Sequence, residues 1–516
     1  MKYVLKISLI VLFNVCFLQS IANSQMNLEW MKRYHGSYSG GSNGANAIDV
    51  DDSGNVYVTG SSQISSSRFD YVTIKYNKFG DSIWTSKYGN DYNISYDLVV
   101  DDSGNVFVAG AGPIIKYNPN GNVVWVSENY QVNYKILLDS LGNIYVAGVR
   151  WYQYITSKYD KYGNRLWNKM YSYEGVCRLY DMVMDDWGNI IITGSSEADS
   201  TDYDYATIKY SNNGNLIWIR RYNGLTISGT PFDAAHAVET DRFGNIYVTG
   251  NSRGLSGGDE CVTIKYDSSG NEIWIKSLTS ASGAYDIKLD NMNSVYVAGR
   301  YGGSSYTFKL DFNSNFLWGQ YYFGGSLLAT NFPKMILDSA SNVYVTANAN
   351  TSGAEDYAFI KYDRAGNKLY DVVYSYSAIG ADYVKDIALD KKGVVYLTGE
   401  VQSNGYAFAT VKFSPIITSI SNNLSTVNNF ELSQNYPNPF NPVTRIEYSV
   451  KDAGPVKITL YDIIGRIIVV LVNENKLPGN YSIVFNAGDY NVSSGIYLYK
   501  FETNNFTETK RMILLK

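Results

Sequence analysis

The sequence predicts an all-β protein in two folded parts, and three observations support this. Tyr (48 residues) and Gly (45 residues) are abundant among the 516 residues, and 45% of the chain is hydrophobic, which suits short strands and tight turns around a sizeable core. One phrase of alternating apolar residues recurs along most of the chain. Near residue 415 the phrase ends and the composition changes. We therefore expect a series of repeated sheets followed by a smaller β domain.

The N-terminal segment has the pattern of a secretory signal peptide. Lys2 and Lys6 precede a mostly apolar stretch at residues 7–18, and Ala22-Asn23-Ser24 supplies small residues for cleavage. We assign residues 1–24 to this signal. No later segment approaches about 20 apolar residues, so no transmembrane segment is expected.

Two cysteines remain after the predicted cleavage, Cys177 and Cys261. An exported chain of this length with two cysteines has no disulfide framework. One disulfide or two buried free thiols both fit the sequence.

The recurring phrase joins two expected strands through an Asp-x-x-Gly-Asn turn. In such a turn Asp accepts backbone N–H bonds and Gly provides a positive φ, so the shared Asp is interpreted as structural rather than as a calcium ligand. The eight copies are AIDVDDSGNVYVTG (47–60), DLVVDDSGNVFVAG (97–110), KILLDSLGNIYVAG (135–148), DMVMDDWGNIIITG (181–194), AVETDRFGNIYVTG (237–250), DIKLDNMNSVYVAG (286–299), KMILDSASNVYVTA (334–347) and DIALDKKGVVYLTG (386–399).

A second phrase such as YVTIKYNKFGDSIW (71–84) follows most copies, so each repeat reads as four strands, a to d. The shared Asp recurs every 38–56 residues, which is the length of a propeller blade. The sequence therefore predicts an eight-bladed β-propeller at residues 25–414, with seven blades as the alternative. Residues 28–34 resemble strand d and residues 409–413 strand c, so we expect these two ends to pair and close the ring.

These repeats resemble the SBBP family of β-propeller repeats, whose pattern is AxxVDxxGNxYVTG followed by DxxxxKxxxxGxxxW. The resemblance covers residues 28–414. It implies a propeller, usually described as seven-bladed, and it implies no particular chemistry.

A Ser/Thr/Asn-rich linker at residues 415–429 precedes a second domain at residues 430–516. Its alternating segments predict a small immunoglobulin-like β-sandwich. The domain resembles the C-terminal sorting domain of the type IX secretion system, also called the Por domain, through NYPNPFNP (435–442), Tyr461-Asp462 with Gly465, and SGIY (494–497). The resemblance implies passage through the outer membrane by the type IX secretion machinery, removal of the domain, and release or attachment at the cell surface.

Charge and motifs exclude several classes of function. The net charge of −5 and the absence of a Lys/Arg-rich run argue against nucleic acid or anionic lipid as partners. His35 and His236 are the two histidines, and neither has a second His or Cys nearby in sequence. Because no nucleophile elbow, P-loop or zinc-protease motif occurs, we assign no catalytic residue, no metal ligand and no cofactor.

The expected function lies at the end of the blades that carries variable loops, at residues 61–70, 195–204, 223–236 and 251–260. Strand a is innermost in a propeller, and the residue that opens it should ring the mouth of the channel on this face. We expect these residues to form a salt-bridged plug or a weak cation site, for example for calcium. The charged members of the ring are Asp97, Lys135, Asp181, Asp286, Lys334 and Asp386, with Ala47 and Ala237 completing it.

The sequence thus favours a secreted or surface-attached binding or adhesion module that recognises a glycan or an extracellular protein. Two alternatives remain open. One is a carbohydrate-active enzyme, a polysaccharide lyase or glycoside hydrolase, which would need two facing carboxylates. The other is a structural surface-layer component.

Overall fold

The computed structural model describes residues 26–515, with gaps at 90–92, 128–130, 174, 200–201, 225–231, 255–257, 325–331, 351–353, 377–379, 404, 417–428, 477 and 491. The chain divides into two compact units, Met1–Pro415 and Ile416–Lys516. The predicted signal peptide and most of the predicted linker lie outside the described residues.

The first unit consists of antiparallel sheets, and its described strands fall into eight groups of four. One bridge, between Val132 and Ala111, joins two of these groups into a single larger sheet. The innermost strands of the groups are β2 (Asn43–Val50), β6 (Ile94–Val100), β10 (Val132–Leu138), β14 (Cys177–Met184), β18 (Ala234–Thr240), β22 (Gly283–Leu289), β26 (Met335–Leu337) and β30 (Asp382–Leu389).

Each innermost strand pairs with the strand that follows it in sequence, and the third strand follows in turn. The second strands are β3 (Val56–Gln63), β7 (Val106–Ala111), β11 (Ile144–Arg150), β15 (Ile190–Asp199), β19 (Ile246–Arg253), β23 (Val295–Tyr301), β27 (Val343–Asn350) and β31 (Val395–Gln402). The third strands are β4 (Phe69–Tyr76), β8 (Ile115–Tyr117), β12 (Gln153–Tyr159), β16 (Asp202–Tyr210), β20 (Asp259–Tyr266), β24 (Ser304–Leu310), β28 (Glu355–Tyr362) and β32 (Tyr406–Pro415).

The outermost strands complete the groups. Seven of them follow their third strand directly: β5 (Ser82–Tyr88), β9 (Val123–Val126), β13 (Arg165–Tyr171), β17 (Leu216–Tyr222), β21 (Glu272–Leu278), β25 (Phe316–Tyr322) and β29 (Lys368–Tyr374). The eighth is β1 (Met26–Tyr34), from the other end of the unit.

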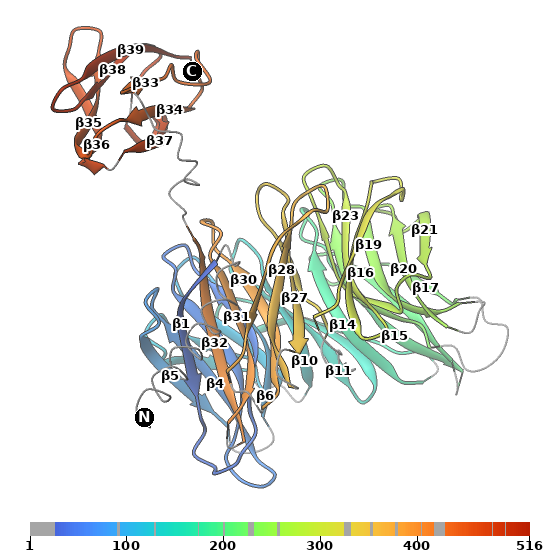
Figure 1. Cartoon of the computed structure of the whole chain (residues 1–516). Helices are drawn as coiled ribbons and strands as arrows, with labels where there is room; N and C mark the ends of the chain where they lie inside the picture. Colours follow the sequence, from blue (N-terminus) through green and yellow to red (C-terminus); the bar gives the residue numbers. More distant parts are fainter. Residues whose placement is uncertain are drawn as a thin grey trace, which may run out of the picture. The chain divides into compact units, whose positions relative to one another are not determined.

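The ring closes through the pairing of β1 with β32. The two strands are antiparallel, with Trp30 opposite Lys412 and Tyr34 opposite Phe408, and they lie side by side in Figure 1. The predicted pairing of the two ends is therefore confirmed. Each innermost strand also contacts the innermost strands of its two neighbouring groups, and β2 contacts both β6 and β30. This closed circuit of radial sheets is a propeller-like fold.

The shared Asp of each repeat organises its turn. In the first repeat, one carboxylate oxygen of Asp51 accepts the N–H groups of Ser53 and Asn55, while the other accepts the Asn55 side-chain amide. Gly54 has φ 80°. Where the phrase lacks this Gly, Asn293 and Ser341 keep φ values of 57° and 62°, so the turn survives the substitution.

Tryptophans on the outermost strands lock neighbouring sheets together. The indole N–H of Trp30 donates to the Lys78 carbonyl in the next sheet, 3.1 Å away, and that of Trp218 donates to the Ser268 carbonyl at 3.2 Å. Each ring covers the Gly of that turn: a Cβ added at Gly270 would lie 2.8 Å from Trp218. On β29, Tyr370 stands where the other outermost strands have Trp. The sheet that follows β29 has no turn after its third strand, because its outermost strand is β1, from the other end of the unit.

The second unit packs two sheets around one core. The first sheet contains β33 (Glu431–Leu432), β34 (Val443–Val450) and β37 (Gly479–Asn486); the second contains β35 (Gly454–Asp462), β36 (Ile467–Lys476), β38 (Gly495–Glu502) and β39 (Thr507–Leu514). A short 3₁₀ helix spans Ala487–Tyr490. Buried residues from both sheets, including Ile446, Ile458 and Phe501, form the core.

Candidate binding face at the loop end of the sheets

The two ends of the sheets differ, and we name them by their connections. The turn end carries the short turns that contain the shared Asp and the Trp-covered Gly. The loop end carries the connections between the second and third strands and between successive sheets. The innermost strands begin at the loop end. The ring residues predicted from sequence therefore lie near this end.

A register shift precedes the ring residue in seven innermost strands. In β6 the pairing with β7 skips from Ser95 to Asp97, so Tyr96 is extruded as a bulge. Bulges are recurrent devices that re-aim a side chain next to functional sites. The residues extruded in this way are Asn46, Tyr96, Tyr134, Tyr180, His236, Tyr285 and Lys385.

The ring aspartates clamp neighbouring sheets. One oxygen of Asp97 accepts the N–H of Leu98 at 3.0 Å, and the other accepts the N–H of Ile136 on β10 at 3.1 Å. The same bond to the next sheet recurs from Asp181 to the Val238 N–H (3.0 Å), from Asp286 to the Met335 N–H (2.7 Å) and from Asp386 to the Ile48 N–H (3.0 Å). These four carboxylates therefore satisfy backbone groups of the sheet that follows.

Lysines neutralise part of this ring. Lys135 Nζ lies 3.3 Å from an Asp181 carboxylate oxygen. Lys288 lies 3.5 Å from both Asp286 and Glu239. Sequence reasoning missed Lys288 and Glu239, although each lies two residues after a ring position, where the two-residue period of a strand returns a side chain to the same face.

The pKa values of the aspartates differ from one side of the ring to the other. Burial raises the pKa of Asp97 to about 6, against the opposing effect of Lys135, and burial also raises the pKa of Asp49 to about 6. For Asp181 burial acts in the same direction, but Lys135 and Lys288 outweigh it and hold the pKa below its usual value. Among the described residues, no group of three or more His, Cys, Asp or Glu side chains is arranged to hold a metal ion.

Aromatic side chains form an arc around the mouth of the ring. Tyr96 and Tyr134 have ring centroids 5.2 Å apart. Tyr180 is 4.6 Å from His236, which is 4.9 Å from Tyr285. Tyr285 stacks on Phe332 at 4.3 Å. We call these residues, Tyr96, Tyr134, Tyr180, His236, Tyr285 and Phe332, the mouth arc.

The mouth arc was not predicted from the sequence, although a signal was present. In five consecutive repeats, an aromatic residue stands immediately before the ring residue. Elsewhere the extruded side chains are polar and bonded: Asn46 donates to the Ser95 carbonyl at 2.7 Å, and Lys385 lies 3.3 Å from Glu400.

The two histidines have different surroundings. His236 contacts the Asn251 side chain through Nε2 at 2.6 Å, and burial lowers the pKa of His236 to about 4. Its ring is therefore neutral at neutral pH and acts as a flat aromatic surface. His35 lies exposed after the end of β1.

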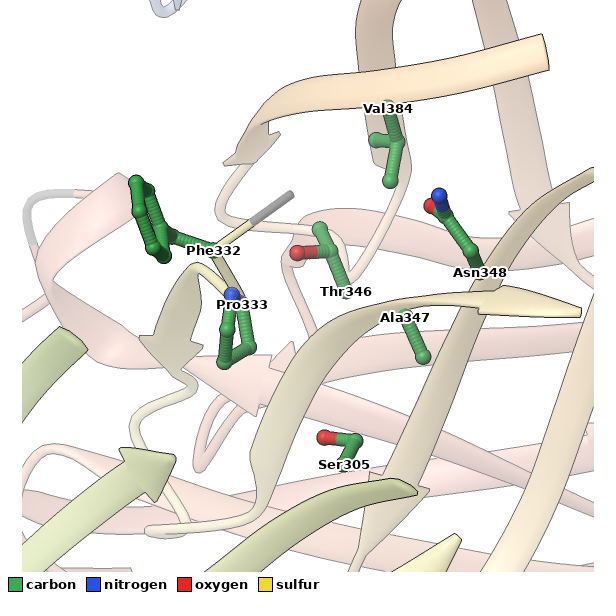
Figure 2. A pocket seen from close by; sticks show the side chains of 7 residues that line it. All are labelled: Ser305, Phe332, Pro333, Thr346, Ala347, Asn348 and Val384. Carbon is green, nitrogen blue, oxygen red and sulfur yellow. The ribbon is translucent and has the colours of Figure 1, made fainter. Parts of the chain in front are cut away.

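A small cavity adjoins the mouth arc. Figure 2 shows Phe332 and Pro333 on one side of it and Asn348 on the other. Its volume is about 10 Å³, room for about one water molecule. The cavity lies beside Ser305, at a strand position where other sheets bury a tyrosine such as Tyr205 or Tyr357. The remaining lining residues are Thr346, Ala347 and Val384.

Cys177 and Cys261 are free and buried in different sheets, on β14 and β20. The structure therefore has the two-thiol alternative. Burial raises the pKa of the Cys261 thiol to about 12, which makes it unreactive near neutral pH. Within the described part of the chain, no helix is long and apolar enough to cross a membrane.

Comparison with protein families identifies the C-terminal region. Residues 434–515 match the family described as "Secretion system C-terminal sorting domain". This confirms the sorting domain expected for the second unit. In that unit the buried Asn435 of the NYPNPFNP segment bonds to the Pro437 carbonyl and to the Thr444 hydroxyl. A search of curated proteins finds no match.

Several solved structures match the chain at low sequence identity. BamB from Moraxella catarrhalis is 13% identical over 75% of this chain and 99% of its own, with a TM-score of 0.47. A virginiamycin B lyase from Staphylococcus aureus is 11% identical over 74% of this chain and 98% of its own, with a TM-score of 0.37. Identities this low transfer no ligand or activity to this chain.

Proposed function

We propose that this protein is an exported eight-bladed propeller that binds carbohydrate through the mouth arc. One observation carries the proposal: the same backbone bulge extrudes an aromatic side chain from each of five consecutive innermost strands, β6, β10, β14, β18 and β22. The eight groups of four strands support the blade count.

The chemistry of the mouth arc suits a sugar. A pyranose ring has an apolar face of C–H groups and an edge of hydroxyls, and a tyrosine offers a flat apolar face with a polar tip. Ser, Gly and Asn in the loops at this end are residues that recognition surfaces combine with tyrosine elsewhere. In addition, the short contacts between Tyr180, His236 and Tyr285 hold the rings in place before a ligand arrives, which reduces the entropy lost on binding.

The charged ring below the arc is proposed to act as a plug. Asp97, Asp181, Asp286 and Asp386 hold adjacent blades together, and Lys135 and Lys288 offset part of their charge. This role supports the geometry of the arc above it. Asp181→Asn should therefore lower stability equally with and without calcium.

A glycan array tests the binding proposal. Full-length protein lacking the signal peptide should bind a subset of the glycans. Tyr285→Leu should weaken that binding by about tenfold or more, because truncating an aromatic anchor of a binding interface commonly costs about 2 kcal/mol. Tyr162→Leu is the matched control, since Tyr162 is an exposed tyrosine at the turn end. Equal effects of the two substitutions would contradict a site at the mouth arc.

Mass spectrometry of the same array spots separates binding from catalysis. Intact glycans would agree with a binding module, whereas cleaved products would replace the proposal with a carbohydrate-active enzyme. Silence over the whole array would favour a structural surface-layer role.

Export is proposed to depend on both ends of the chain: the signal peptide at residues 1–24 for the inner membrane, and the domain at residues 430–516 for the type IX secretion machinery. The family match at residues 434–515 supports the second step. Deleting residues 430–516 should trap the propeller in the periplasm, and the intact chain should reach the cell surface or the medium. Normal delivery of the deleted chain would contradict this role.

A further inference from the structure

The turn end carries large apolar side chains on one half of the ring only. In each group of four strands, the turn between the first two strands contains the shared Asp and then two exposed residues, and we call the second of these the tip residue. In the third to sixth groups the tip residues are Leu141, Trp187, Phe243 and Met292, with exposed fractions of 76%, 58%, 58% and 61%. We call these four residues the tip arc. In the other four groups the tip residues are Ser53, Ser103, Ala340 and Lys392.

The turn does not require a large tip side chain. The backbone N–H of Ser53 donates to the Asp51 carboxylate at 3.0 Å. The backbone N–H of Trp187 donates in the same way to Asp185, at 3.1 Å. Because Ser and Trp serve this turn equally well, the fold does not explain the tip arc. Single exposed apolar residues are ordinary, whereas a patch of them is typical of an interaction site.

The tip arc is continuous from one group to the next. Its four groups are neighbours in the ring, since β10 contacts β14, β14 contacts β18 and β18 contacts β22. The Trp187 ring reaches the turn of the following group: a Cβ added at Gly244 would lie 2.6 Å from it. Aromatic residues and Met are enriched in the cores of protein–protein interfaces. The tip arc therefore has the composition of such a core.

Charge divides the same face into two halves. The residue before each tip residue is acidic in three of the first four groups and basic in two of the last four, and it is uncharged elsewhere. The acids are Asp52, Asp102 and Asp186, and the bases are Arg242 and Lys391.

Two pairs of opposite charge occupy equivalent positions in neighbouring turns, but only one pair is joined. Lys391 in the eighth group bonds to Asp52 in the first at 2.7 Å. In the fourth and fifth groups, the Arg242 guanidinium instead stacks on the Phe243 ring, 4.9 Å away. Asp186 and Arg242 are both exposed, and neither forms an ion pair with another described residue. Both charges are therefore available to another molecule.

We infer that the tip arc docks a second copy of this chain, which gives a face-to-face dimer. A two-fold axis that lies in the face and runs between the turns of the fourth and fifth groups brings each half of the ring onto the other half of the second copy. Leu141 then faces Met292 of the second copy, and Trp187 faces Phe243. The tip arc covers itself.

Charge complementarity favours a second copy over an unrelated partner. The same axis places Asp186 opposite Arg242 of the second copy, and it places Asp52 opposite Lys391. Acids and bases therefore meet on both sides of the face, and complementary charge fixes the register of an interface. This inference goes beyond the proposed function, since the loop ends with their mouth arcs stay free on both copies.

Sedimentation velocity of full-length protein lacking the signal peptide tests the dimer. The protein should sediment at twice the monomer mass at micromolar concentration and dissociate on dilution. Trp187→Ser should weaken the dimer at least about tenfold, because a buried Trp is a common anchor of an interface. The variant should fold, since Ser is the tip residue of two other groups.

Trp151→Ser is the matched control. Trp151 is 75% exposed at the loop end, so its replacement should leave the dissociation constant of the dimer unchanged. A monomer at every concentration, or equal effects of Trp187→Ser and Trp151→Ser, would overturn the inference.

A charge exchange tests the register of the two copies. Asp186→Arg faces Arg242 of the second copy and should weaken the dimer about tenfold, because like charges repel across an interface. Adding Arg242→Asp to the same chain exchanges the two charges and should restore the dissociation constant to within about twofold. A dimer that ignores Asp186→Arg, or that the second change does not restore, would contradict the proposed pairing.

A lipid surface is the alternative occupant of the tip arc. Co-sedimentation with vesicles of phosphatidylcholine and phosphatidylglycerol separates the two. Monomeric protein that binds the vesicles, and loses this binding on Trp187→Ser, would replace the dimer with membrane docking. Dimeric protein that stays in the supernatant would support the inference. Neither measurement contains a glycan, so the result is independent of carbohydrate binding at the mouth arc.

Discussion

The turn end and the loop end of the sheets use the same kinds of residue for different purposes. At the turn end, Asp51 and its equivalents bond within their own turn, and Trp218 and its equivalents bond to the next turn. At the loop end, Trp151 projects into solvent. Among the described residues, Ser195 Oγ, Arg253 Nε and Asp70 Oδ1 are buried there without a hydrogen-bond partner.

This difference separates the residues that hold the scaffold from those available to a ligand. A residue that recurs in every repeat and bonds within or between repeats is explained by the fold. A residue that breaks the repeat pattern at the loop end, with strain or with unpaired polar atoms, is not explained by the fold and is a candidate for recognition. Paired substitutions at the two ends test this distinction.

The largest effect is expected for a tryptophan at the turn end. Trp218 is 6% exposed and bonds to the next sheet, so Trp218→Ala should lower the free energy of unfolding by about 3–5 kcal/mol. Trp151→Ala removes a residue that is 75% exposed and should change it by less than about 0.5 kcal/mol. Urea denaturation of the two variants measures the difference. Similar losses would show that the loop-end tryptophan also supports the fold.

A smaller loss is expected for a buried ion pair at the turn end. Asp185 lies 2.9 Å from Lys209, and both side chains are almost fully buried. Asp185→Asn leaves the Lys209 ammonium without its charge partner and should cost about 3 kcal/mol. Asp186→Asn changes the exposed neighbour in the same turn and should be nearly neutral. If thermal denaturation shows equal Tm for the two variants, the shared Asp has no structural role.

The sequence predicted the turn end far better than the loop end. The shared Asp, the turn Gly and the Trp are local or repeated signals, and their spacing fixed the strand order and the pairing of Trp30's strand with the last repeat. Five of the six charged ring residues lie within the innermost strands, and Lys334 lies one residue before β26. Their bonding was not foreseen, because a carboxylate that accepts an N–H from the next sheet depends on the distance between sheets.

The mouth arc shows a different limit of prediction from the sequence. The sequence contains the aromatic residue before each ring residue, but an alternating strand would direct it away from the ring residue's face. The register shift that extrudes it is a property of paired strands, which one sequence does not reveal. Similarly, the residues Trp151 and Tyr152 do not predict a turn with positive φ, since turns of that kind normally contain Asn or Gly.

The smallest expected effect is a pH-dependent change in Tm, and it distinguishes two aspartates of the same ring, Asp97 and Asp181. The pKa of Asp97 is about 6 in the folded protein, above the value of about 3.9 in an unfolded chain, so the folded state binds a proton more tightly. Its contribution to stability is therefore present below about pH 4 and is lost as the pH rises through about 6. Because Asn resembles the protonated form, Asp97→Asn should raise Tm relative to the original protein by more at pH 7.5 than at pH 4.5.

Asp181 is the matched control for this pH effect. Lys135 and Lys288 hold its pKa below the usual value, so it stays charged at both pH values. Asp181→Asn should therefore lower Tm by the same amount at pH 7.5 and pH 4.5. Differential scanning calorimetry of the three proteins at the two pH values supplies the comparison. If the Tm change caused by Asp97→Asn is also independent of pH, the uncompensated charge lies elsewhere in the ring, and the division of the ring into a neutralised and an acidic side is wrong.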